Sequence, residues 1–348
     1  MSSAETVLVT GASGFIATHC LLKLASMGYK LRGTVRDLER TSSLDNILIN
    51  GLKKYYHSST ISVDWFAVDL LSDDGWREAC DGCDYVLHVA SPVAITVKHE
   101  DELINPARNG TLRVLNAALA AKVKRAVITS SVSAITAGHP RDTRIFTEDV
   151  WSNTDTDACS PYEKSKTFAE RAAWDFFASN GSNIELCTIN PSLVFGPVLE
   201  TDIGASVNLL REMFDGKYPF APDLNFGIVD VRDVASLHVL AMTHPRANGN
   251  RFICNAETMP VLEISRILQS LYPNYTKRLP TRKAPNLLIK LLALFDPVMR
   301  AIVPNLDSPL EFDNSKAKDL LGWKPRPATE AIQDAAKSLM ELPILKSL

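Results

Sequence analysis

The 348-residue sequence has no long apolar run and no large excess of charge. Its most apolar segment, Leu287 to Phe295, is interrupted by Lys290 and ends at Asp296, well short of the ~20 residues that cross a bilayer. The N-terminus also lacks the basic stretch and apolar core of a secretory signal. Lys and Arg number 37 and Asp and Glu 40, so the net charge of −3 does not attract polyanions in general. We therefore predict a protein that has no membrane span, is not exported and does not bind nucleic acid.

Cysteine is sparse as well. The six cysteines form no disulfide framework, which is typical of a reducing compartment and predicts a cytoplasmic location. Cys80 and Cys83 form a CxxC, but no second Cys pair or His pair at zinc spacing accompanies them. The pair also follows a predicted helix instead of opening one, so we predict neither a metal site nor a redox role.

Short apolar runs alternate with longer amphipathic segments through the first half of the chain, as in βαβ units. This predicts an α/β fold, a Rossmann-type doubly wound parallel sheet. Residues 1–190 are expected to form the dinucleotide-binding domain, which also carries the catalytic residues. Residues 191–348, rich in proline, are expected to form mainly a smaller, loop-rich substrate lobe, with some segments returning to the first domain. The predicted strands are Thr6–Thr10, Leu31–Val35, Ile61–Val68, Tyr85–Val89, Arg125–Thr129 and Ile184–Ile189, and the predicted helices span 14–27, 42–55, 74–80, 100–121, 161–179, 313–322 and 328–340.

A glycine-rich turn follows the first predicted strand and precedes a helix. Gly11 suits the tight turn, Gly14 allows the backbone to approach a pyrophosphate, and Ala17 satisfies the third, packing position of the dinucleotide fingerprint. The helix N-terminus supplies unpaired N–H donors. We predict that the turn binds the cofactor phosphates through Gly11, Ser13, Gly14, Phe15 and Ile16.

The end of the second strand sets the choice of cofactor. Arg36 stands where a guanidinium would hold a 2′-phosphate, and Arg40 follows it, so NADPH is predicted in preference to NADH. The alternative is that Asp37 points at the ribose, which would favour NADH. The ends of the third and fourth strands are also expected to line the nucleotide crevice, through Asp69, Leu70, Val89, Ala90 and Ser91.

A candidate acid–base pair stands at the start of the 161–179 helix. Ser160, Pro161 and Glu163 have the pattern of a capped N-terminus. Tyr162 and Lys166 are then four residues apart on one helical face. A nearby ammonium lowers the pKa of a phenol, which suits tyrosine for proton transfer at neutral pH.

With these motifs in the right order, the sequence resembles the extended short-chain dehydrogenase/reductase family over about residues 5–260. T-G-A-S-G-F-I-A from Thr10, Arg36, S-P-Y-E-K-S-K from Ser160 and N-P-S-L-V-F-G-P from Asn190 look like the branch of dihydroflavonol reductases, cinnamoyl-CoA reductases and microbial aldehyde/ketone reductases.

The resemblance implies a role for each matching residue. Tyr162 would donate a proton to the substrate carbonyl, and Lys166 would hold the nicotinamide ribose and tune Tyr162. Ser131, or failing it Ser130, would hydrogen-bond the same carbonyl oxygen. Pro191, Ser192, Leu193 and Val194 would flank the nicotinamide, and Ser206 is a further candidate for a phosphate contact. One departure concerns the helix before Gly110, where many relatives have an asparagine and this chain has Ala107; Asn105 or Asn109 could replace it, or each could be a plain surface residue.

The resulting function is NADPH-dependent reduction of aromatic or bulky aldehydes or ketones. One alternative is a 3β-hydroxysteroid dehydrogenase or an NAD-dependent nucleotide-sugar epimerase/dehydratase built on the same residues, and another is a catalytically silent nucleotide sensor. Phenylalanines in 138–160 and 195–226 could line a pocket or form core. The segment 285–303 is either a lid or a partner surface.

Overall fold

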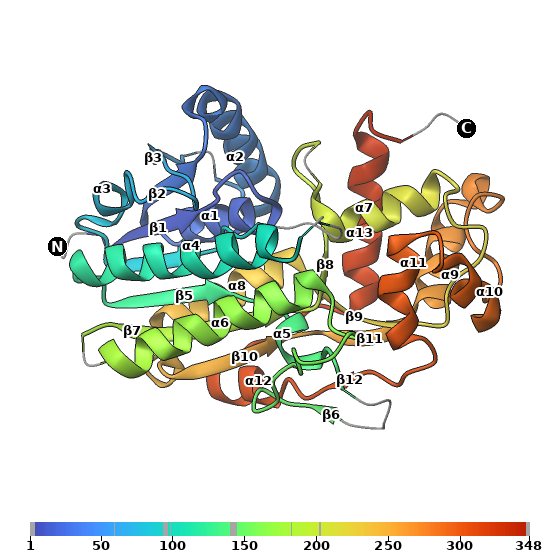
Figure 1. Ribbon diagram of the computed structural model, residues 1–348. Helices are drawn as coiled ribbons and strands as arrows, with labels where there is room; N and C mark the ends of the chain where they lie inside the picture. The colour runs from blue at the N-terminus through green and yellow to red at the C-terminus, as the bar shows by residue number, and fades with distance from the viewer. Residues whose placement is uncertain are drawn as a thin grey trace.

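The structure is a computed structural model that describes residues 4–58, 60–92, 97, 99–139, 145–181, 183–201 and 203–345. Seven parallel strands form its main sheet in the order β10-β7-β5-β4-β1-β2-β3 (Figure 1). Their bounds are β1 (Thr6–Thr10), β2 (Lys30–Val35), β3 (Val63–Ala67), β4 (Tyr85–His88), β5 (Arg125–Thr129), β7 (Glu185–Pro191) and β10 (Asn250–Cys254). The sheet confirms the predicted Rossmann-type α/β fold. The sequence did not predict β10, because its apolar run covers only Phe252–Cys254 and follows the polar Asn250 and Arg251.

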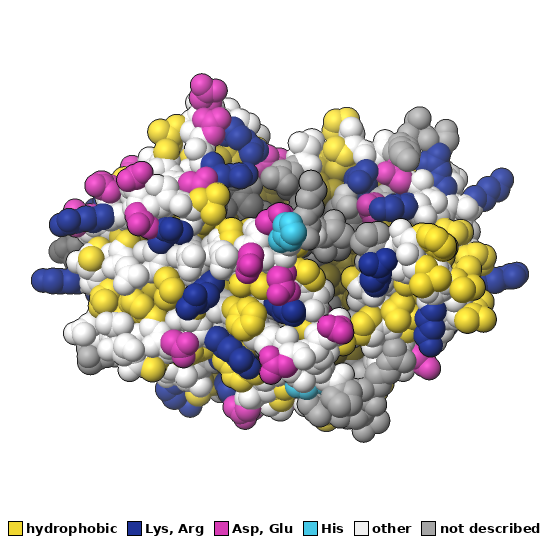
Figure 2. All heavy atoms as spheres, in the orientation of Figure 1, with side chains coloured by type: hydrophobic (Ala, Val, Ile, Leu, Met, Phe, Trp, Pro, Cys, Tyr) yellow, Lys and Arg dark blue, Asp and Glu magenta, His cyan; other side chains and the backbone are white. Residues whose placement is uncertain are grey.

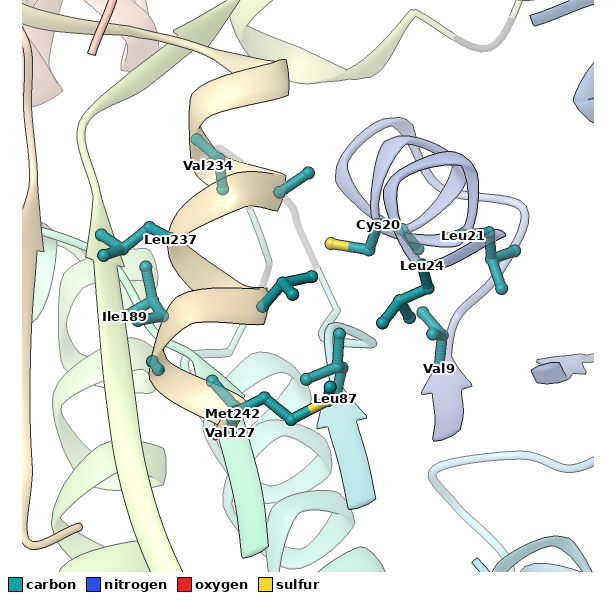
Figure 3. Close-up of a cluster of buried hydrophobic side chains, with 14 of the residues drawn as sticks. Val9, Cys20, Leu21, Leu24, Leu87, Val127, Ile189, Val234, Leu237 and Met242 are labelled. Carbon is teal, nitrogen blue, oxygen red and sulfur yellow. The ribbon is translucent and has the colours of Figure 1, made fainter. Parts of the chain in front are cut away.

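Helices cover both faces of the sheet. One face carries α1 (Phe15–Ser26), α2 (Thr41–Tyr56) and α8 (Val231–Thr243), and the other carries α3 (Trp76–Cys80), α4 (Asp101–Ala120) and α6 (Pro161–Asn180). Figure 3 shows Cys20 and Leu24 of α1 and Leu237 of α8 on either side of a shared core over the strands. Burial of these apolar faces is the main stabilising term of such a layer.

A second lobe follows β7. Its three-stranded sheet contains β8 (Leu193–Phe195), β9 (Asn225–Asp230) and β11 (Glu257–Pro260) in the order β11-β9-β8. Its core lies among α7 (Gly204–Phe214), α9 (Val261–Leu271) and α13 (Ala328–Glu341), and α10 (Asn286–Leu292) and α11 (Pro297–Ile302) lie at its outer end (Figure 1). The remaining short elements are α5 (Ser133–Thr136), β6 (Ile145–Phe146), β12 (Glu311–Phe312), α12 (Ser315–Leu321) and the 3₁₀ turns Leu38–Arg40, Pro245–Ala247, Pro273–Tyr275 and Val303–Asn305.

The chain crosses between the two lobes more than once. Although β10, α8 and α12 follow residue 190, β10 extends the large sheet, and α8 and α12 pack on that part of the fold. We propose residues 1–190 as the dinucleotide-binding domain and 191–348 as the second lobe with these returning segments. Among the helices of the described residues, none is long and apolar enough to span a bilayer.

Candidate active site

The parallel strands bring distant residues to one edge. Because the carboxyl ends of parallel strands share an edge, the loops after β1, β2, β3, β4, β5 and β7 open on the same side. β1 and β4 are neighbours, and the chain leaves the sheet in opposite directions from the two halves. This switch point is where open α/β sheets bind ligands.

The glycine turn after β1 is built for close backbone approach. Gly11 has φ +63°, and a Cβ there would lie 2.9 Å from the Ala90 Cα, so a larger residue would clash with the end of β4. Gly14 begins α1 without any side-chain cap, which leaves the first-turn amides available to an anion. Ala17 is fully buried. These features fit the phosphates of a dinucleotide.

Thr10 links the ends of β1 and β4. Its hydroxyl oxygen accepts from the amides of Val89 (3.1 Å) and Ala90 (3.0 Å). With both lone pairs used, its single proton donates to His88 Nδ1 at 2.8 Å. Burial, followed by the nearby Lys166 charge, lowers the pKa of His88 to about 3. His88 is therefore a neutral core histidine.

Arg36 and Asp37, which follow β2, have different surroundings. The Asp37 carboxylate accepts from the Glu39 amide at 2.9 Å and so caps the turn Leu38–Arg40. Arg36 is exposed at the carboxyl end of the strand, and Arg40 forms an ion pair of 3.3 Å with Glu200.

Ser131, Tyr162 and Lys166 meet at the same edge. The Ser160 hydroxyl accepts from the Glu163 amide at 3.3 Å and the Glu163 carboxylate accepts from the Ser160 amide at 2.7 Å, so the predicted capping box places Tyr162 in the first turn of α6. Tyr162 shares a side-chain hydrogen bond with Ser131, and the Lys166 Nζ lies 5.8 Å from its ring centroid.

Burial dominates the electrostatics of this pair. Burial raises the pKa of Tyr162, and the hydrogen bond with Ser131 lowers it by a smaller amount. Burial lowers the pKa of Lys166 to about 8, although the negative charge of Glu170 acts to raise it. No described residue accepts a hydrogen bond from the buried Lys166 ammonium. A cavity of about 10 Å³, room for about one water, lies beside Lys166 and is also lined by Ala90 and Ser91.

Comparison with known proteins identifies the family. The model of the NAD-dependent epimerase/dehydratase family matches residues 7–256. The chain belongs to this family. It is 38% identical to cinnamoyl-CoA reductase CAD2 of Medicago truncatula over 79% of this chain and 84% of that protein. It is 34% identical to cinnamoyl-CoA reductase 1 of Petunia hybrida over 97% and 93%. The crystal structure of the yeast methylglyoxal/isovaleraldehyde reductase Gre2 with NADPH covers 97% of this chain and 98% of its own, with TM-score 0.77 and 27% identity.

These relatives confirm the predicted short-chain dehydrogenase/reductase assignment and make the chain a nicotinamide-dependent oxidoreductase. Of the other predicted cofactor residues, some follow strands of the large sheet and some lie in the second lobe. Pro191 lies beside Ser131, because the Ser131 hydroxyl is 3.5 Å from the Pro191 carbonyl oxygen. The Ser206 hydroxyl accepts from the Val194 amide at 3.3 Å. Asp69 and Leu70 follow β3, and Leu193 lies at the start of β8.

Sequence reasoning missed a buried ionic network beneath the site. Glu170, wholly buried, accepts from Ser130 Oγ at 2.5 Å and from Arg251 Nε at 2.7 Å. Arg251 in turn donates to the carbonyls of Glu148 (2.6 Å) and Val150 (2.8 Å). Glu170 stands four residues after Lys166, and that spacing was the available signal.

Several other predicted features prove structural. Ala107 is buried, whereas Asn105 and Asn109 are exposed on α4, so they occupy the plain surface positions. Phe214 is buried in the second-lobe core against Tyr272 and Tyr275. In the segment 138–160, considered above as a pocket wall or core, residues 140–144 lie outside the described residues.

All six cysteines are free and buried. Burial raises the pKa of Cys80 to about 12 and that of Cys83 to about 11, so neither thiol is reactive at neutral pH. Within the part of the chain that the structure describes, no group of His, Cys, Asp and Glu is suited to hold a metal ion.

Proposed function

We propose that this protein is an NADPH-dependent reductase of aldehydes or ketones, with aromatic or bulky carbonyl compounds as its substrates. The observation that carries the proposal is the placement of a phenol, a buried ammonium and a hydroxyl at the same sheet edge as the glycine turn. Reduction of the carbonyl oxygen needs a proton donor and a hydrogen-bonding partner in one place. The reductase activity of its relatives supports the same function.

Each of the three side chains has a distinct proposed role. Tyr162 donates its phenolic proton to the carbonyl oxygen, and Ser131 orients that oxygen by a second hydrogen bond. Lys166, whose Nζ lacks an acceptor among the described residues, binds the nicotinamide ribose hydroxyls and stabilises the phenolate left on Tyr162 by its charge. The bound nicotinamide supplies the hydride. The hydrogen bond that the Ser130 hydroxyl donates to Glu170 supports Ser131, and not Ser130, in the substrate role.

The cofactor is held by the glycine turn and the end of β2. The uncapped N-terminus of α1 and the clash that a Cβ at Gly11 would make support pyrophosphate binding there. Arg36 supports NADPH because its guanidinium matches a phosphate, while Asp37 is engaged in capping. The NADPH complex of the related yeast reductase Gre2 supports the same choice.

We expect Arg36→Glu to raise the KM for NADPH by about 10- to 100-fold, because hydrogen bonds to charged groups contribute roughly 1.5–3 kcal/mol. The KM for NADH should change by less than about threefold, since its 2′-hydroxyl can donate to the new carboxylate. Steady-state kinetics with both cofactors measures this. Asp37→Asn is the matched control, because the amide oxygen can still cap the turn. Equal losses for both cofactors would exclude the role of Arg36.

The function itself is tested by NADPH and NADH oxidation with a panel of carbonyl compounds: aromatic aldehydes, α-ketoesters, a dihydroflavonol and a ketosteroid. NADPH-dependent turnover of at least one class supports the reductase. No turnover, together with a nicotinamide cofactor that co-purifies with the protein, would favour an epimerase-type enzyme. We also propose a cytoplasmic location, supported by the six free thiols, and a small-molecule substrate without nucleic-acid binding.

A further inference from the structure

The outer end of the second lobe exposes a concentrated apolar surface. Twelve large hydrophobic side chains are exposed among the described residues, and six of them lie within nine positions of the chain. We call these six the α10 surface: Leu287, Leu288, Leu291, Leu292, Leu294 and Phe295. Phe295, just beyond the helix, is 87% exposed. Solvent-exposed apolar residues that gather in this way mark an interaction site.

The fold does not need these side chains for its own core. Ile289 faces inward from α10 and packs with the buried cluster around Leu262 and Leu306, and Ala293, directly after the helix, is buried as well. The short connection between α10 and α11, which carries Phe295, is held in place at its end. There the Asp296 carboxylate caps α11 by accepting from the Val298 amide at 2.8 Å. The α10 surface is therefore presented on an ordered support, with its leucines on the side away from the core.

Positive charge surrounds the α10 surface. Residues 277–300 contain six basic residues and one acidic residue, Asp296, which leaves 31 basic and 39 acidic residues in the rest of the chain. The basic residues are Lys277, Arg278, Arg282, Lys283, Lys290 and Arg300. Figure 2 shows the apolar side chains at this end of the molecule with Lys and Arg side chains around them. One of these cations, Lys283, forms a 2.6 Å ion pair with Asp223.

We propose that the α10 surface docks on an anionic phospholipid bilayer. Leucine and phenylalanine side chains partition into the boundary between headgroups and acyl chains, and the surrounding Lys and Arg attract acidic headgroups. A bilayer of this kind therefore binds both the apolar side chains and the basic side chains. A second copy of this chain fits less well, because two such faces would bring like charges together. The protein would lie on the membrane without crossing it.

Vesicle co-sedimentation of the full-length protein tests the proposal. Vesicles of 70% phosphatidylcholine and 30% phosphatidylserine should bind the protein at least about tenfold more tightly than pure phosphatidylcholine vesicles, because Lys and Arg side chains near the membrane attract acidic headgroups. Leu291→Glu combined with Phe295→Glu should weaken binding roughly tenfold or more. Lys290→Glu should weaken binding to the acidic vesicles alone.

Matched variants separate the α10 surface from general effects. Met27→Glu alters a residue that is 52% exposed elsewhere, and Lys53→Glu alters an exposed cation on α2; neither should change vesicle binding. The thermal unfolding midpoint verifies that each variant is folded. Equal binding to both vesicle types would overturn the proposal, and so would no binding. A concentration-dependent dimer in sedimentation velocity that is absent in the Leu291/Phe295 double variant would overturn it in favour of a second copy of the chain.

Discussion

Tyr162→Phe is expected to lower kcat for carbonyl reduction by about 10²- to 10⁴-fold, the usual contribution of a general acid. The substitution keeps the ring, which lies 5.8 Å from the Lys166 ammonium, and removes only the hydroxyl that hydrogen-bonds Ser131. The binding of NADPH should change little, because Lys166 and the glycine turn remain. Single-turnover kinetics and cofactor fluorescence titration measure the two effects separately.

Ser130→Ala and Ser131→Ala form a matched pair of controls for the same site. Ser131→Ala should reduce kcat by about 10-fold or more through the loss of an oxygen-stabilising donor. Ser130→Ala should act on stability instead, since its hydroxyl donates to Glu170. A Tyr162→Phe enzyme with unchanged kcat would exclude Tyr162 as the acid and would favour a protein whose biological output does not depend on turnover.

The pH dependence of the wild-type enzyme follows from the same groups. Burial holds the pKa of Lys166 near 8 and raises that of Tyr162. Reduction needs Tyr162 protonated and is helped by the charge on Lys166, so kcat should be constant below the Lys166 pKa and fall as pH rises through about 8.

The parts of the site that could be predicted are local in sequence. A strand, two glycines and a helix within some twenty residues determine the phosphate turn, and the capping box of α6 depends only on Ser160 and Glu163. The sheet followed because nearly continuous apolar runs alternate with helices. The family assignment rests on the order of these motifs.

What could not be predicted depends on contacts between segments far apart in the chain. Ser130 and Ser131 are adjacent, yet one hydroxyl donates to Glu170 and the other meets Tyr162. Only the folded positions of Glu170 and Tyr162, both on α6, separate the two serines. β10 was missed for a similar reason, because Asn250 and Arg251 at its start are polar, and the buried partner of Arg251, Glu170, is distant in the sequence.

Glu170→Ala is expected to lower the free energy of unfolding by about 3–5 kcal/mol, the usual cost of removing one partner from a buried ion pair. The carboxylate has no exposed surface and lies 2.7 Å from Arg251 Nε, which is itself buried. Thr188 and Asn190 also donate to it, at 2.8 and 2.7 Å. Urea unfolding at neutral pH, followed by circular dichroism, measures the loss.

Glu185→Ala is the matched control, because it removes the partner of another arginine in the same sheet. Glu185 is 45% exposed, and Arg125 keeps its bonds to the carbonyls of Ala241 and Met242. Water replaces the lost carboxylate there, so the cost should be under about 1 kcal/mol. Similar losses of unfolding free energy for the two variants would contradict the prediction that the buried Glu170 contributes more to stability than Glu185.

The charge of Glu170 also reaches the site through Lys166. It raises the Lys166 pKa against the effect of burial, so its removal must lower that pKa further. In Glu170→Gln, which keeps the size of the side chain, the fall of kcat with pH should therefore begin at a lower pH than in the wild type. A purely structural role would reduce stability without moving the pH profile. The shift thus distinguishes a carboxylate that tunes Lys166 from one that only holds Arg251.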